Sequence, residues 1–290
     1  MPEPPTFKGQ NMAGTLSRSI DLLKNTWRVL MMDKELLLFP VLSGLGTILI
    51  ALSFLLPIFF MGILGEIGGF GPLVWFLALF FFYYVSYAVV IFFNTGLIAC
   101  ATIRFSGGDP TVRDGIRFSL DNLGKILSWA LVAATVGLVL NLLSRRSGFI
   151  SRIIIAIIGI AWSLATFLVI PVMVFEDKSV FAAISDSWQL LKRTWGENII
   201  VHFGLGILFV PPILLMLFTI LSVMTGNLPL VFVMTALTII GFVVSGILHA
   251  TLHGIFVAAL YQFATTGTIP GHMQGNLIRE AFVPEVPPVR

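Results

Sequence analysis

The sequence predicts an all-α membrane protein with six transmembrane helices, arranged as three tandem units of an amphipathic interfacial helix plus a transmembrane hairpin. Three observations lead to this prediction: a composition with few charges, six long apolar stretches, and a repeated segment in front of the hairpins. Because successive units keep the same orientation, we expect pseudo-threefold symmetry about an axis along the membrane normal.

The composition excludes a globular cytosolic enzyme. Hydrophobic types make up 57% of the 290 residues and charged types only 11%, whereas soluble proteins carry about 25% charged residues. The net charge of +3 does not indicate a nucleic-acid partner, because the basic residues lie between apolar runs and form no patch. The single cysteine, Cys100, excludes an intrachain disulfide and a cysteine-rich metal site, and no cofactor is expected.

Six stretches are long enough to cross a bilayer, for which about 20 mostly apolar residues suffice. The first begins too far along the chain, and is too long, to be a signal peptide. None of the six contains Asp, Glu, Lys or Arg, and they cover Leu36–Leu64, Leu73–Ile103, Ile126–Leu143, Ile153–Phe175, Ile199–Met224 and Leu228–Phe263.

The loop charges predict the orientation. Fourteen of the 17 Lys and Arg residues fall on one side of the membrane, and the other three are Arg145, Arg146 and Arg152. The positive-inside rule therefore places both termini in the cytoplasm. We expect the protein to lie in the plasma membrane. The three outer arginines could bind lipid phosphates or another anion, or could cap their helices by snorkelling.

A repeated segment divides the chain into units. Ser19–Trp27 matches Ser187–Trp195 at six of nine positions, and Gly115–Leu123 is a fainter copy. The units cover about residues 14–108, 109–178 and 179–270, which together form the membrane domain. Residues 1–13 are expected to be a flexible N-terminus and residues 271–290 a cytoplasmic tail.

Each copy reads as an amphipathic helix with an apolar stripe at helical spacing. In the middle copy, Thr111 and Asp114 have the spacing of a capping box. Trp27, Trp188 and Trp195 suit the headgroup zone as interfacial anchors, although these helices could equally pack beneath the bundle.

Four segments resemble a family of uncharacterised prokaryotic six-span integral membrane proteins, a domain of unknown function. They are Asp33–Pro40 (DKELLLFP), Phe92–Leu97 (FFNTGL), Ala161–Pro171 and Leu190–Glu197 (LLKRTWGE). The resemblance covers roughly residues 15–270. It implies a multi-pass membrane protein of unknown function, and it carries no catalytic or binding residues to transfer.

A possible polar site lies within the apolar spans. His249 and His253 are four residues apart and share a helix face. They could polarise a ligand, move a proton, hold a metal together with His202, or simply form hydrogen bonds between helices. Superposing the units adds three further polar groups near the proposed axis, and these are Asn94, Thr95 and Thr166.

Three functions from different classes fit these features, and one of them is a membrane enzyme that acts on a lipid-like substrate through His249 and His253. The protein is expected not to be an enzyme, which leaves two. The first is a non-enzymatic scaffold or accessory protein that contacts lipids, a membrane protein partner or a second copy of itself. The alternative is a passive permease or a lipid- or small-molecule-binding transporter with a cavity near His249 and His253. A continuous, polar-lined cavity that reaches His253 from the cytoplasm or the bilayer would favour the alternative or the enzyme, whereas a dry, filled centre would favour the scaffold.

Overall fold

The computed structural model describes residues 26–63, 71–146, 148–195 and 204–267. Within these ranges all regular structure is helical, and six helices are long and apolar enough to cross a membrane, as the sequence predicts. The expected flexible segment 1–13 and the tail 271–290 lie outside the described residues. So does most of the first repeated segment, of which residues 26–27 belong to a helical stretch over 26–32.

The first hairpin consists of α2 (Leu38–Ile63), entered through the short 3-10 helix η1 (Lys34–Leu37), and α3 (Pro72–Phe105). α3 begins at Pro72. Proline is tolerated at this position because the first N–H groups of a helix have no partner within the helix, so the missing N–H costs no hydrogen bond. Its 34 residues correspond to about 51 Å of helix, well over the ~30 Å hydrocarbon core. The buried residues of α3 all lie in its second half, from Ile91 to Phe105.

The middle hairpin follows the ten-residue helix α4 (Val112–Asp121) and begins with α5 (Leu123–Arg146). The predicted capping box is confirmed: the Asp114 N–H donates to Thr111 Oγ1 at 3.3 Å, and the Thr111 N–H donates to Asp114 Oδ2 at 2.9 Å. These bonds satisfy backbone donors that the first turn of a helix leaves free.

The fourth span is one apolar stretch in the sequence but two helices in the structure, α6 (Phe149–Ala165) and α7 (Val169–Phe175). Pro171 provides no N–H for the turn before it, and a proline ring clashes with the carbonyl four residues earlier. At the interruption the backbone N–H of Leu168 donates instead to Ser187 Oγ at 2.9 Å. A side chain of α8, a later helix, therefore satisfies a backbone N–H group that the break leaves free.

The last third of the chain contains α8 (Val180–Trp195), the 3-10 helix η4 (Gly204–Phe209), α9 (Val210–Met224) and the 39-residue α10 (Leu228–Thr266). The Asn227 side chain caps α10 by accepting from the Leu230 N–H at 3.2 Å. Gly267 ends α10 in the left-handed conformation, with φ of 68°, which glycine adopts without a steric penalty.

α8 buries one face and exposes another. Val180, Ala183 and Leu191 are buried together with Ser187, whereas Phe181 is 75% exposed. α4 makes a contact similar to that of Ser187, because its Ser119 Oγ donates to the Phe92 carbonyl of α3 at 2.8 Å. Each of these two helices thus uses one buried serine to bond the backbone of a preceding span.

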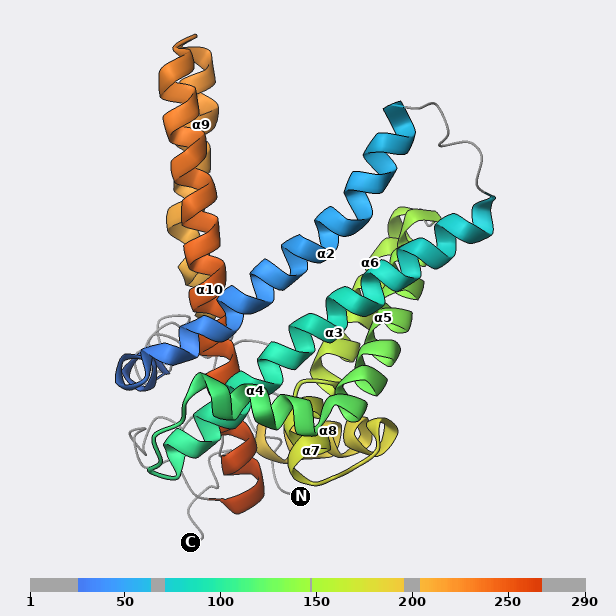
Figure 1. The fold of residues 1–290 in the computed structure, drawn as a ribbon, viewed down its shortest axis with the longest axis vertical. Helices are drawn as coiled ribbons and strands as arrows, with labels where there is room; N and C mark the ends of the chain where they lie inside the picture. The colour runs from blue at the N-terminus through green and yellow to red at the C-terminus, as the bar shows by residue number, and fades with distance from the viewer. Residues whose placement is uncertain (1–25, 64–70, 147, 196–203, 268–290) are drawn as a thin grey trace, which may run out of the picture.

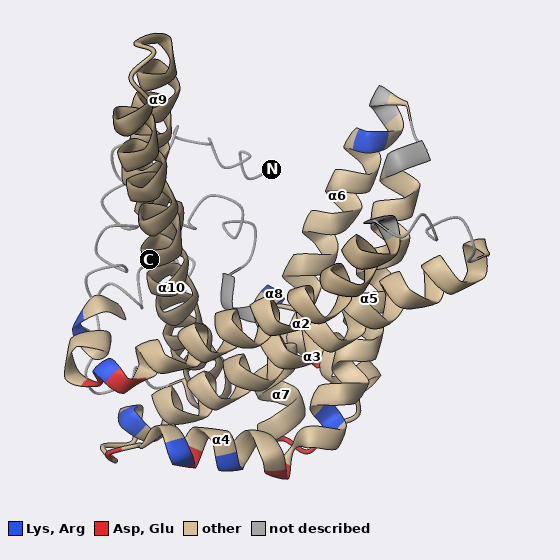
Figure 2. Cartoon of the chain, turned by 45° about the horizontal axis from the view of Figure 1, so that its top comes forward, with Lys and Arg blue, Asp and Glu red and all other residues tan. Residues whose placement is uncertain are grey.

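The spans converge at one end and diverge at the other (Figure 1). The α9–α10 hairpin stands apart from the arm that contains α2, α3, α5 and α6, and α4, α7 and α8 lie where the two arms meet. Charged residues gather mainly at this meeting point, around α4 (Figure 2). The long apolar arms and the charged base give the molecule one end that suits lipid and one that suits water.

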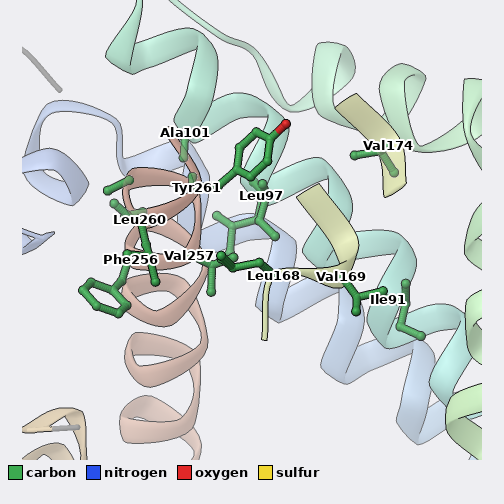
Figure 3. Packing of buried hydrophobic residues seen from close by; sticks show 14 of the residues in the cluster. Ile91, Leu97, Ala101, Leu168, Val169, Val174, Phe256, Val257, Leu260 and Tyr261 are labelled. Carbon is green, nitrogen blue, oxygen red and sulfur yellow. The ribbon is translucent and has the colours of Figure 1, made fainter. Parts of the chain in front are cut away.

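The core lies at the base of the arms, where α3, α7 and α10 meet. Leu97 of α3, Leu168 beside α7 and Val257 of α10 are buried there close to one another (Figure 3). Gly254 permits this approach, since a Cβ atom at that position would lie 2.3 Å from Leu97 Cδ2.

A charge network ties the start of η1 to α3 and α4. Arg104 forms ion pairs with Asp33, at 3.2 Å, and with Asp109. Glu35 Oε2 accepts from the Val112 N–H at the start of α4, at 3.2 Å. Burial raises the pKa of the Asp33 carboxyl, and its hydrogen bond to Arg104 opposes that rise.

Candidate functional site

A cavity of about 270 Å³ lies where α2, α3 and α10 converge. It brings together three of the residues that the sequence singled out, Asn94, His249 and His253. Its remaining lining residues come mostly from α2 and α3, and they are Phe39, Pro40, Ser43, Val90, Phe93, Leu97 and Ala250. The volume exceeds the ~150 Å³ of an engineered apolar cavity that takes up benzene.

The two histidines occupy successive turns of α10 and lie face to face. Their ring centroids are 6.1 Å apart with an interplanar angle of 26°. Phe209 of η4 packs against His249, and Phe167 approaches His253 edge-on, each with centroids 5.4 Å apart. Aromatic rings from two other segments therefore hold the imidazoles in place.

Two polar groups of the cavity have unused hydrogen-bonding capacity. His249 Nδ1 is buried and has no hydrogen-bond partner among the described residues. The Asn94 side-chain amide likewise forms no hydrogen bond to any residue that the structure describes. Because the His249 nitrogen is buried, leaving it unsatisfied costs about 1–3 kcal/mol. Both groups are thus available to a ligand that enters the cavity.

The rest of the cavity wall determines which ligands fit. Its ten lining residues include no Asp, Glu, Lys or Arg, and most are apolar. Since an unpaired charge in such a setting is strongly disfavoured, the cavity suits an uncharged molecule. Within the described residues, no group of three or more His, Cys, Asp or Glu could hold a metal ion.

Thr95 and Thr166, which the sequence analysis grouped with the histidines, do not line this cavity. The hydroxyl of Thr95 donates to the Ile91 carbonyl at 2.8 Å, and that of Thr166 donates to the Trp162 carbonyl at 2.8 Å. Each threonine therefore bonds to the backbone four residues earlier. His202 falls outside the described residues.

The arginines and tryptophans singled out by the sequence lie elsewhere. Arg152 is exposed near the start of α6, while Arg145 and Arg146 end α5 with side chains outside the description. Trp27 is 41% exposed and Trp188 is 45% exposed. Trp195 is the last residue of α8, and its side chain is not described either.

Sequence reasoning missed the contribution of α2 and of the aromatic supports. Ser43 adds a hydroxyl to the cavity, and Phe39 forms part of its wall. The available signal was weak: Pro40 and Ser43 are three residues apart and so share a helix face. Nothing in the sequence places Phe167 or Phe209 against the histidines, because these contacts join segments far apart along the chain.

A family model described as a family of unknown function (DUF6159) matches residues 73–271. No curated protein matches the chain. The matched region includes Asn94, His249 and His253 but not α2, which supplies one wall of the cavity.

Proposed function

The chain belongs to a family of unknown function (DUF6159), and we propose that this membrane protein binds an uncharged amphiphilic molecule in the cavity between α2, α3 and α10. The amphiphile would place a small polar group against Asn94 and His249 and its apolar part against Phe93 and Leu97. The observation that carries the proposal is a cavity reaching both histidines of α10.

The polar groups favour a ligand that both donates and accepts hydrogen bonds. The Asn94 amide offers a carbonyl acceptor and an NH₂ donor, and a neutral imidazole offers one of each. A hydroxyl-rich head group such as a glycerol moiety would match these sites. Because the His249 nitrogen is buried, a ligand that satisfies it gains more than it would at an exposed surface.

We also propose that the protein lies in the plasma membrane with both termini in the cytoplasm, and that it acts without catalysis. The positive-inside pattern of the loops supports the orientation. The gathering of charge at the end where α4 lies is consistent with it (Figure 2). Binding without chemistry is the simpler role for a cavity whose lining contains no carboxylate.

Equilibrium binding of radiolabelled 1-oleoylglycerol to the purified protein in nanodiscs tests the proposal. The expected result is saturable binding that His249→Leu and Asn94→Leu each weaken about five-fold, because each loses a hydrogen bond of roughly 1 kcal/mol. Thr235→Val is the matched control. Its hydroxyl bonds only to Val231 of the same helix, and Thr235 does not line the cavity.

Binding that is unsaturable, or that all three variants leave equal, would refute the proposed ligand site. The scaffold function would then stand as the better hypothesis. Labelling of the two termini from outside intact cells checks the orientation separately, and reaction at either end would contradict it.

A further inference from the structure

A second cavity, of about 460 Å³, lies between α3, α5 and α6. It shares no lining residue with the first cavity. Five of its ten lining residues are small, two are aromatic and three are larger aliphatic residues. The residues used below are Tyr87, Ala133, Gly137, Gly159, Trp162 and Ser163.

The shape of this cavity follows from its walls. Ala133 and Gly137 on α5 face a space bounded by Gly159 and Ser163 on α6. A Cβ atom built on Gly159 would meet no atom within 4 Å, so the space beside it is open. The space is therefore a slot between two helices that have small residues facing it at these four positions, with Leu140 and Ile160 also in its walls.

Two stacked tryptophan side chains lie beside the slot and connect α5 with α6. Trp129 of α5 and Trp162 of α6 lie with centroids 6.0 Å apart and an interplanar angle of 28°. Trp129 is only 6% exposed, and Trp162 forms part of the cavity wall. The stack therefore joins α5 to α6 directly beside the slot.

One hydroxyl of the slot is available to a ligand. Tyr87 Oη lies 3.1 Å from the position that a Cβ atom of Gly137 would take, so it points at the facing wall. No described residue forms a hydrogen bond with it. The other hydroxyl, Ser163 Oγ, already donates to the Gly159 carbonyl at 3.0 Å.

We propose that this slot binds a flat, uncharged ring compound with a carbonyl oxygen, which accepts a hydrogen bond from Tyr87 and packs against Trp162. Small residues on α5 and α6 leave room for a planar ring, and the aromatic walls favour stacking. The hydroxyl has no other partner among the described residues, and it requires an acceptor.

The depth of Tyr87 distinguishes such a ligand from an ordinary lipid tail. Tyr87 is the sixteenth residue of the 34-residue α3, about 22 Å along the helix axis from its start. That position is near the middle of the span, whereas the ester oxygens of bilayer lipids lie at the membrane surface. A lipid tail at this depth would leave the hydroxyl without an acceptor.

Fluorescence quenching by menadione, a naphthoquinone, tests this site. The other four of the six tryptophans are replaced, so that only Trp129 and Trp162 fluoresce. This variant is titrated in nanodiscs. The expected result is saturable quenching, which Tyr87→Phe weakens about five-fold through loss of one hydrogen bond. Gly159→Leu, which fills the slot, should abolish saturation.

Gly44→Leu is the matched control, because Gly44 also has open space beside it and lines neither cavity. It should leave the quenching curve unchanged. If Gly159→Leu fails to fold, Gly137→Ala narrows the slot beside the Tyr87 hydroxyl instead and should weaken binding.

Two outcomes would overturn the proposal. Quenching that rises linearly and equally in every variant would show only partition of menadione into the bilayer. Native mass spectrometry that detects a phospholipid lost in Gly159→Leu but not displaced by menadione would assign the slot to a lipid tail. Neither outcome bears on binding at the cavity with the histidines, which is measured separately.

Discussion

Replacement of Gly115 by alanine tests the close contact of α3 with α4. A Cβ atom on Gly115 would lie 2.4 Å from Phe39 Cζ, 2.8 Å from Cys100 Sγ and 2.8 Å from the Gly96 carbonyl oxygen. The two side chains can shift, but the carbonyl belongs to the backbone of α3. The added methyl group therefore forces α4 away from α3.

The size of the effect follows from two opposing terms. An extra methylene in a well-packed site typically costs about 1–3 kcal/mol. Alanine regains at most about 1 kcal/mol over glycine through its higher helix propensity. We therefore expect Gly115→Ala to lower the free energy of unfolding by about 1–2 kcal/mol.

Cys100 provides the assay, because it is the single cysteine of the chain and its side chain is buried. A thiol-reactive fluorophore labels it only when α3 and α4 separate, so the labelling rate in increasing SDS reports the stability of this contact. Gly44→Ala is the control, since nothing lies within 4 Å of its Cβ position and we expect no loss. Equal midpoints for Gly115→Ala and the parent protein would refute the reasoning.

Two further predictions concern polar contacts at the base. Ser187→Ala should lower the free energy of unfolding by about 1–3 kcal/mol, because it leaves the buried Leu168 N–H unpaired. Ser185→Ala is the control, since Ser185 is exposed and its loss should not change stability. Equal midpoints for the two variants in the labelling assay would contradict this prediction. Hydrogen bonds to Asp186 and Glu176 raise the pKa of Lys178 from 10.5 to about 12, so its stabilisation is complete below pH 10.5 and is lost as the pH rises through about 12. Lys178→Met should flatten that part of the stability profile, and an unchanged profile would disprove the link.

The number of helices could be predicted from the sequence because it depends on local composition. Six charge-free stretches gave six helices able to span a membrane, and the Thr111–Asp114 spacing gave the capping box. Pro171 marks the fourth span as one that can be interrupted. The hydrogen bond that completes the interruption could not be predicted, because it comes from Ser187 on another helix. The pseudo-threefold arrangement stays a prediction.

The candidate site was only partly accessible to sequence reasoning. The four-residue spacing of His249 and His253 places them on one face of α10, and the structure brings Asn94 to the same cavity. It does not bring Thr95, which is buried and bonds to its own helix. When every face of a helix is apolar, hydrophobic periodicity cannot tell which polar residue faces which neighbour.

The separation of the α9–α10 hairpin from the other arm links the first cavity to the thickness of the membrane. The buried residues of α10 are concentrated over Thr251–Tyr261, and its outer part pairs with α9, where the Thr219 and Thr238 hydroxyls share a hydrogen bond of 2.8 Å. A long hairpin held only at its base adjusts to a thinner bilayer by tilting. His249 and His253 lie near that base, so we expect hydrophobic mismatch to alter the width of the ligand site. Each binding measurement should therefore be made in nanodiscs of short-chain lipids and in nanodiscs of long-chain lipids.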